Sequence, residues 1–92
     1  MNVSFACRDT QALFEGRRCA RFRNIESVAL RRLQPLNAAV TLSFLRMPPG
    51  NRLEPLCGDR DGQWSLRING QWRLCFHWED GHAHRVAIVD YH

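Results

Sequence analysis

Two runs of alternating residues in the second half of the chain constrain its fold more than any other feature of the sequence. Trp64, Leu66 and Ile68 are separated by polar residues, and the run between Trp72 and Trp78 repeats the pattern. Successive side chains of a strand point to opposite faces of a sheet, so a period of two indicates strands with one buried face. We therefore predict that a sheet with one apolar face forms the second half of the fold.

An Asn-Gly pair between these two strands bears on how they pair. Such a pair favours a two-residue type I′ turn, but that turn would place Leu66 opposite Arg73 and mix the two faces. A three-residue loop at positions 68–70, with Gly70 in the left-handed conformation, places Leu66 opposite Trp72 instead. We predict this second register because it keeps the apolar residues on one face.

Three further elements complete the predicted sheet. The Glu-Asp-Gly sequence at 79–81 predicts a second hairpin turn. Residues 85–89 are apolar on both faces, as in a strand with neighbours on both sides. Near the N-terminus, Val3 and Phe5 alternate with polar residues, which predicts a short opening strand.

The rest of the first half has the three- and four-residue spacing of helices. Asp9 or Thr10 can cap a short helix that runs to Glu15 and is ended by Gly16. A main helix is predicted after it, and its apolar stripe consists of Ile25, Val28, Ala29, Leu33 and Leu36.

The ends of the main helix are predicted from its flanking residues. Asn24 is a favourable N-cap, and Pro35 should kink or end the helix near Gln34 because it has no amide hydrogen. A separate helical turn is predicted around 41–46, and Pro-Pro-Gly at 48–50 marks the passage from helices to strands. Helices followed by strands indicate an α+β fold.

The length of 92 residues, 45% of them hydrophobic, suffices for one modest core, so we predict a single domain spanning 1–92. No apolar stretch approaches the roughly 20 residues that cross a bilayer, and the N-terminus lacks the order of a signal peptide. We therefore expect a cytoplasmic protein without a membrane partner. The four cysteines lack zinc-site spacing, which predicts reduced thiols and no metal, although Cys57 and Cys75 could meet in space.

All thirteen basic residues are arginines, and the net charge is +4. Two explanations remain open: selection for a planar donor group that binds phosphate, and the codon usage of a GC-rich genome. The charge is uneven, because residues 1–52 contain nine arginines and three acids whereas residues 53–92 contain four arginines and six acids. This asymmetry predicts a polyanionic partner for the basic half.

Two sets of residues could carry chemistry. Arg67 and Arg73 should share the polar face of the sheet, with Arg60 in the preceding turn, and could hold phosphates; an ordinary solvated face is the alternative. The sequence Asp-Tyr-His at 90–92 combines a carboxylate, a phenol and an imidazole, which could move protons or stack on a base. A frayed tail is the alternative. The negative charges of Asp90 and of the terminal carboxylate would favour the protonated form of His92, and a protonated His92 would suit the role of a general acid.

Four segments of the sequence together closely resemble the HigB branch of the RelE toxin superfamily. They are Pro-Pro-Gly-Asn-Arg-Leu-Glu at 48–54, Gly-Asp-Arg at 58–60, Gln-Trp-Arg-Leu-Cys-Phe at 71–76 and Val-Asp-Tyr-His at 89–92. The similarity extends over essentially the whole chain, including Leu-Phe-Glu at 13–15 and the main helix.

The resemblance implies a RelE-like fold, in which N-terminal helices pack on one face of a twisted antiparallel sheet. It also implies a ribosome-dependent mRNA endonuclease that cuts codons in the A site without a metal or cofactor. The implied inhibitor is a HigA-like antitoxin with a helix-turn-helix domain, and operator DNA would be bound only through the toxin-antitoxin complex.

The resemblance also implies roles for individual residues. The RNA 2′-hydroxyl attacks the adjacent phosphate, and Arg73 would stabilise the dianionic pentacovalent state. Asp90 and His92 would transfer protons or orient the substrate, and Tyr91 would stack on a base or assist proton transfer. Arg52 is expected among the RNA-binding residues, together with Arg60, Arg67 and Cys57.

Two positions depart from the family pattern. Family members often have Lys where this chain has Cys57, and some have His where it has Glu54. Loss of the Lys removes a cation beside the phosphate, an interaction of several kcal/mol in comparable sites. Glu54 could serve as the base, and Arg60 could replace part of the missing charge or belong to a turn.

Because a fold does not fix a function, other classes remain open. One is a toxin without catalysis, which blocks the ribosome or poisons gyrase as the ParE branch of the same superfamily does. Another is a degenerate toxin that only modulates its antitoxin. The retained Arg73 and the Asp-Tyr-His sequence at 90–92 favour the endonuclease.

Overall fold

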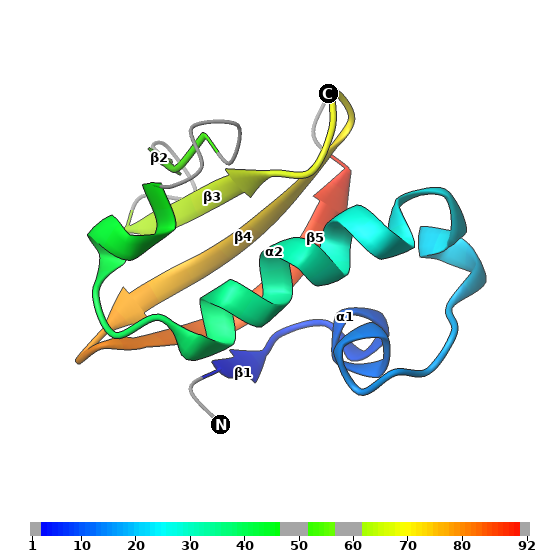
Figure 1. The fold of residues 1–92 in the computed structure, drawn as a ribbon, viewed down its shortest axis with the longest axis horizontal. Coiled ribbons are helices and arrows are strands. Elements are labelled where there is room, and N and C mark those ends of the chain that lie inside the picture. Colours follow the sequence, from blue (N-terminus) through cyan, green and yellow to red (C-terminus); the bar gives the residue numbers. More distant parts are fainter. Residues whose placement is uncertain (1–2, 47–51, 57–61, 91–92) are drawn as a thin grey trace.

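The computed structural model describes residues 3–46, 52–56 and 62–90. Within them, strands form a single sheet in the order β1-β5-β4-β3-β2 (Figure 1). β1 runs parallel to β5, and the other neighbouring pairs are antiparallel. The strands are β1 (Val3–Phe5), β2 (Glu54–Pro55), β3 (Gln63–Arg67), β4 (Trp72–Glu79) and β5 (His82–Asp90).

In the described residues, two α-helices and two 3₁₀ helices accompany the sheet, namely α1 (Arg8–Phe14), α2 (Glu26–Ala38) and the 3₁₀ helices Ala20–Ile25 and Leu42–Arg46. Figure 1 shows α2 lying across the sheet and α1 beside it. Their buried leucines join one apolar core with residues of the sheet. The predicted α+β fold, with helices before the main strands, is therefore confirmed.

The apolar face of the sheet meets the helices. Leu66, Leu74 and Ile88 lie directly opposite one another on β3, β4 and β5, and each is at most 1% exposed. They belong to the same core as Leu13 of α1 and Leu33 of α2. Burial of apolar surface at about 25 cal/mol per Å² makes this face the main source of stability. The predicted period of two is thus confirmed.

The register of β3 with β4 differs from the prediction. Leu66 pairs with Leu74 rather than with Trp72, and Arg67 pairs with Arg73. The predicted faces are correct because the difference is two residues, and a shift of two keeps every side chain on its side. The predicted loop length is wrong, because four residues, 68–71, connect the strands.

The side chain of Asn69 explains the longer loop. Its Oδ1 accepts hydrogen bonds from the amides of Gln71 and Trp72, both at 2.8 Å. Asparagine favours turns for this reason, since its side chain can bond to amides two residues along the chain. The φ angle of Gly70 is not positive, so the predicted left-handed glycine is wrong. The loop is closed by a side chain instead.

The second hairpin and the interior strand agree with the sequence. Asp80 and Gly81 have φ angles of 53° and 76°, as a two-residue type I′ turn requires. Glu79 pairs with His82 across this turn. β5 lies between β1 and β4, which confirms the prediction that residues 85–89 form a strand with neighbours on both sides.

The start of α1 differs from the prediction. The helix begins at Arg8, and Cys7 is its N-cap residue without a side-chain capping bond. Neither Asp9 nor Thr10 caps it, because both lie within its first turn. The predicted end is confirmed: Gly16 has a φ angle of 88°, the left-handed conformation that glycine adopts without strain.

The bounds of α2 also differ. Asn24 lies in the preceding 3₁₀ helix, and Ile25 rather than Asn24 is the N-cap residue. Pro35 does not end the helix, which continues to Ala38. Leu33 and Leu36, on either side of the proline, are completely buried. Their packing outweighs the roughly 3 kcal/mol that an interior proline costs.

Candidate functional site

Polar residues lie on the face of the sheet that is opposite the apolar core. Ser65 and Arg67 of β3 alternate with buried Leu66, and Arg73 and Cys75 of β4 flank buried Leu74. Ser65 lies opposite Cys75 in the ladder, and Arg67 lies opposite Arg73. Residues directly opposite each other share a face, so these four side chains start from the same side of the sheet.

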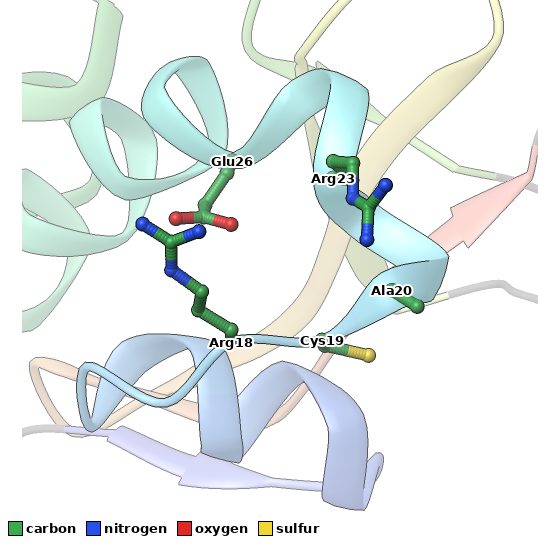
Figure 2. Close-up of a pocket in the computed structure, with 5 residues that line it drawn as sticks. All are labelled: Arg18, Cys19, Ala20, Arg23 and Glu26. Carbon is green, nitrogen blue, oxygen red and sulfur yellow. The ribbon is translucent and has the colours of Figure 1, made fainter.

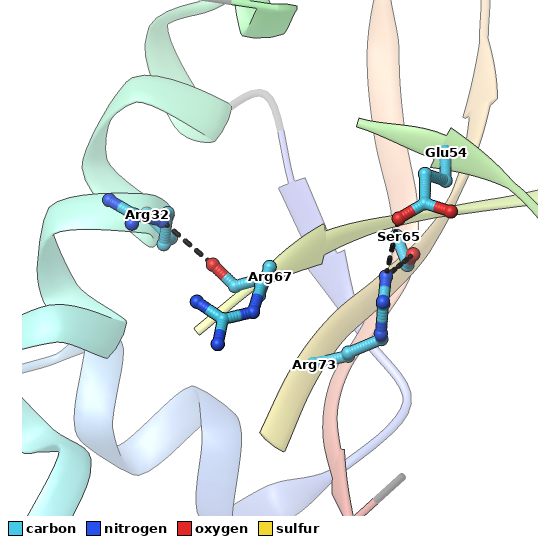
Figure 3. A network of polar contacts seen from close by, with 5 residues as sticks. All are labelled: Arg32, Glu54, Ser65, Arg67 and Arg73. Carbon is cyan, nitrogen blue, oxygen red and sulfur yellow. Dashed lines mark hydrogen bonds and ion pairs between the residues drawn. The ribbon is translucent and has the colours of Figure 1, made fainter. Parts of the chain in front are cut away.

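Arg73 is held on this face by two oxygen atoms. Its Nη1 donates to Ser65 Oγ at 3.1 Å and forms an ion pair with Glu54 Oε1 at 3.2 Å (Figure 3). β2 supplies the carboxylate, because Glu54 pairs with Ser65 on β3. Three strands therefore contribute one residue each to a single polar contact. The site brings together two of the predicted catalytic residues, Arg73 and Glu54.

The partial burial of Arg73 determines how strongly this site can act. Its side chain is 21% exposed, whereas that of Glu54 is 51% exposed. Ser65 is completely buried. An arginine that is partly shielded from water acts more strongly on an anion than an exposed one does. The arrangement thus places a fixed cation beside a solvent-accessible carboxylate. The cation is suited to binding a phosphate, and the carboxylate is suited to proton transfer next to that phosphate.

Arg67 does not join this contact. Its side chain extends away from Arg73 and toward Arg32 of α2 (Figure 3). The main-chain oxygen of Arg67 accepts a hydrogen bond from Arg32 Nε at 3.0 Å. The two arginines that were expected to act together on one face therefore diverge at the end of β3.

Asp90 lies near the same end of the sheet but on its other face. It pairs with Trp72, whereas Arg73 pairs with Val89. Since neighbouring residues of a strand point to opposite faces, the Asp90 carboxylate starts on the side of the helices. Its Oδ2 accepts a hydrogen bond from Gln71 Nε2 at 3.1 Å. The structure therefore separates Asp90 from the Arg73 and Glu54 pair.

The structure describes only one of the remaining predicted site residues. Arg52 is exposed. Cys57, Arg60, Tyr91 and His92 lie outside the described residues, so their predicted roles stay predictions.

Two residues of the site were not expected from the sequence. Ser65 was not distinguished from the other polar residues between Trp64 and Ile68, and Arg32 was not distinguished from the other arginines of residues 1–52. The bond of Ser65 with Arg73 depends on the register of two strands, and that of Arg32 with Arg67 joins residues 35 positions apart. No local pattern signals either contact.

A hollow of about 90 Å³ lies beside the N-terminal end of α2. Figure 2 shows the Arg18 guanidinium and the Glu26 carboxylate pointing toward each other across it, with Arg23 pointing away from them. Cys19 and Ala20 complete its lining. Because the Glu26 carboxylate belongs to its lining, this hollow is a weaker candidate for an anion site than Arg73.

Three further observations concern metal ligands, disulfide bonds and membrane-crossing helices among the described residues. Within residues 3–46, 52–56 and 62–90, no three His, Cys, Asp or Glu side chains are grouped as metal ligands. The described cysteines Cys7, Cys19 and Cys75 form no disulfide bond. None of the helices found there has the length and apolarity needed to cross a membrane.

Solved structures of toxins share this fold. The YoeB-YefM complex from Staphylococcus aureus matches with a TM-score of 0.63 and 20% identity, covering 100% of this chain and 97% of that chain. The YoeB/ParE toxin from Agrobacterium tumefaciens matches with a TM-score of 0.52 and 17% identity, covering 100% and 99%. At these identities the similarity concerns the fold.

Sequence comparison identifies the family. Toxin HigB-1 of Vibrio cholerae is 50% identical over 60 residues, which are 65% of this chain and 63% of that protein. Endoribonuclease HigB of Proteus vulgaris is 36% identical over 61 residues, 66% of this chain and 65% of that protein. The matches thus span slightly less than two thirds of these relatives. Because the model of RelE-like toxins of the type II toxin-antitoxin system HigB matches residues 12–92, the chain belongs to the HigB-like toxin family.

Proposed function

We propose that this protein is the toxin of a type II toxin-antitoxin pair and that it cuts mRNA as an endoribonuclease. The observation that supports this most is the Arg73 guanidinium, which Ser65 and Glu54 hold on the face of the sheet opposite the helices. The name of the Proteus vulgaris relative, an endoribonuclease, agrees with the proposal.

The geometry is suited to attack by the RNA's own 2′-hydroxyl. Glu54 accepts the proton of that hydroxyl, the 2′-oxygen bonds to phosphorus, and the bond from phosphorus to the 5′-oxygen breaks. Arg73 stabilises the negative charge that accumulates on the phosphate oxygens in between. The products are a 2′,3′-cyclic phosphate and a 5′-hydroxyl end, and the departing 5′-oxygen takes up a proton.

We assign that last proton to His92, with Asp90 and Tyr91 orienting the substrate, as the family resemblance implies. Because the Asp90 side chain starts on the other face from Arg73, it acts at the end of the sheet rather than beside the attacked phosphate. Arg52, Arg60 and Arg67 would bind neighbouring parts of the RNA, and Cys57 would line the site.

The proposed partners follow from the same assignment. A cognate antitoxin inhibits the toxin, as the complex of the Staphylococcus aureus neighbour suggests. We expect this antitoxin to be HigA-like, with a helix-turn-helix domain through which the pair binds operator DNA. The cut mRNA would be bound in the ribosomal A site, in the cytoplasm.

Inducible expression with and without the antitoxin, followed by mapping of RNA 5′ ends, tests the proposal. We expect cuts inside translated codons, with 5′-hydroxyl ends that disappear when the antitoxin is present. Arg73→Gln and His92→Gln should abolish most cleavage. Arg8→Gln, which removes an exposed arginine at the start of α1, should cut as fast as the wild-type protein.

Three results would contradict the proposal in different ways. Intact mRNA on stalled ribosomes would indicate a ribosome blocker. DNA double-strand breaks with intact RNA would indicate a gyrase poison. Normal growth during expression would indicate a degenerate toxin. A His92→Gln variant that cuts at the wild-type rate would remove only the role of His92.

A further inference from the structure

Arg32 of α2 and Arg67 of β3 form a pair of cations beside the proposed active site. Figure 3 shows the Arg32 side chain beside the main chain of Arg67 at the end of β3, with the two guanidinium groups pointing in different directions. Arg32 is fixed there, because its Nε donates to the main-chain oxygen of Arg67 at 3.0 Å. β2 pairs with β3 at Trp64 and Ser65. The Arg32 side chain contacts β3 further along the strand, at Arg67, past these paired positions.

The immediate surroundings of this pair are positively charged. Burial lowers the pKa of Arg32, and the charges of Arg31 and Arg67 lower it further. Within the part of the chain that the structure describes, no carboxylate lies within ion-pair distance of Arg32 or Arg67. The repulsion between these like charges at a partly buried position costs free energy that a bound anion would offset.

We propose that Arg32 and Arg67 form a second phosphate-binding site, which holds an RNA phosphate next to the one at Arg73. The inference rests on the proposed function and extends it to a residue of α2. Arg67 and Arg73 lie directly opposite each other in the ladder, but their side chains diverge. One RNA strand can therefore pass from the first arginine site to the second.

The chemistry favours a phosphate of RNA over a carboxylate of a protein partner. A guanidinium presents its donors in a plane that matches two oxygens of one phosphate, and two such groups from different elements can hold it from two sides. Arg67 also lies opposite Arg73 in the ladder, so a single RNA backbone can reach all three arginines. An acidic segment of the antitoxin is the competing ligand.

The test measures binding separately from cleavage. The probe is a short single-stranded RNA carrying 2′-O-methyl groups, which cannot attack the phosphate, and its affinity for the full chain is measured by fluorescence anisotropy over a range of salt concentrations. The variants are Arg32→Gln, Arg67→Gln and the double substitution. Arg8→Gln is the matched control, because it removes one exposed arginine at the start of α1.

We expect each single variant to raise Kd about tenfold or more, as removal of a charge-assisted hydrogen bond does. The slope of log K against log salt should fall by roughly 0.7, because each variant binds one phosphate fewer than the wild-type protein. The double variant should weaken binding by less than the two single effects combined, because both arginines hold the same phosphate. Arg67→Gln keeps the main-chain oxygen that Arg32 binds, so it tests the charge without removing that bond.

The inference is overturned if Arg32→Gln and Arg67→Gln bind the RNA as Arg8→Gln does. If they weaken binding of the antitoxin instead, the pair recognises an acidic protein segment. Failure of the proposed function gives a different result, namely a wild-type protein that binds this RNA no better than the Arg73→Gln variant and makes no cuts in unmodified, translated mRNA.

Discussion

The hydroxyl of Thr10 in α1 accepts a hydrogen bond from the main-chain amide of Ile88 in β5, at 3.0 Å, and both residues are buried. The pairing of β1 with β5 ends at Phe5 and Val86, where the chain turns toward α1. Thr10 therefore binds a main-chain amide of β5 just past the point where the pairing of β1 with β5 ends. This explains why a polar side chain lies in the core.

Replacement of Thr10 by Val should lower the free energy of unfolding by about 1–3 kcal/mol, because a buried amide then has no acceptor. Thr10→Ser keeps the hydroxyl and should cost less, which makes it the matched control. Urea denaturation followed by circular dichroism measures both. Equal stability of the two variants would show that the hydroxyl contributes nothing.

The sequence predicts local features of this fold better than long-range ones. The alternation from Trp64 to Trp78 identified two strands and their buried face, because a period of two follows from strand geometry alone. The contact of Thr10 with Ile88 joins residues 78 positions apart, and no local pattern encodes it. A bulge at Arg85, whose φ angle is 53°, was equally hidden from the sequence.

The proline in α2 shows how packing overrides local preference. Pro35 has no amide hydrogen to donate within the helix, and its ring crowds the preceding turn. The helix nevertheless continues to Ala38. Pro35→Ala should therefore raise the free energy of unfolding by about 1–3 kcal/mol. This range allows for the greater freedom that alanine gives the unfolded chain, which offsets part of the gain.

Thermal denaturation measures this effect, with Gln34→Ala as the control because Gln34 is exposed on the same helix. A rise in Tm for Pro35→Ala alone is the expected result. A lower Tm would mean that the proline ring contributes packing that exceeds its backbone cost.

The candidate site was predicted in part. Arg73 was identified by its place in the strand and by the family resemblance, and Glu54 was considered as a base. Their contact and the anchoring by Ser65 arise from the pairing of β2, β3 and β4. The separation of Asp90 from Arg73 likewise depends on the pairing of β4 with β5, whose register was not predicted from the sequence.

Ser65→Ala tests whether Arg73 must be held in position. Removal of a hydrogen bond to a charged group, worth about 1.5–3 kcal/mol, should lower kcat/KM for RNA cleavage about tenfold or more. Ser65→Thr keeps the hydroxyl and should restore part of the activity. If Ser65→Ala lowers only the free energy of unfolding and cuts RNA normally, Ser65 has no positioning role.

The Asn69 side chain gives a prediction for the β3 and β4 hairpin. Its Oδ1 accepts two main-chain hydrogen bonds, at 2.8 Å each, and both are exposed. Asn69→Ala should lower the free energy of unfolding by about 1 kcal/mol, whereas Asn69→Asp keeps the acceptor oxygen and should cost less. Urea denaturation distinguishes these outcomes, and equal destabilisation by both variants would contradict the role of the oxygen.

Cys7 precedes α1, and its environment favours the thiolate. Burial by itself raises the pKa of the thiol, but the nearby hydroxyl and main-chain amide of Thr10 and the main-chain amide of Asp9 lower it, as does the charge of Arg21. The net result is a pKa below the ordinary value of 9.0. Because the thiolate is the reacting species, alkylation of Cys7 should accelerate at lower pH than alkylation of an unstructured peptide thiol.

Iodoacetamide labelling across a pH series, with peptide mapping to isolate Cys7, measures this midpoint. The folded protein favours the thiolate, so the linked stability is present above the unfolded pKa and is lost as the pH falls through the folded one. Thr10→Val should raise the midpoint toward that of the reference peptide, and Thr10→Ser should leave it nearly unchanged. A wild-type midpoint at or above that of the peptide would mean that burial outweighs the groups at this helix end that lower the pKa.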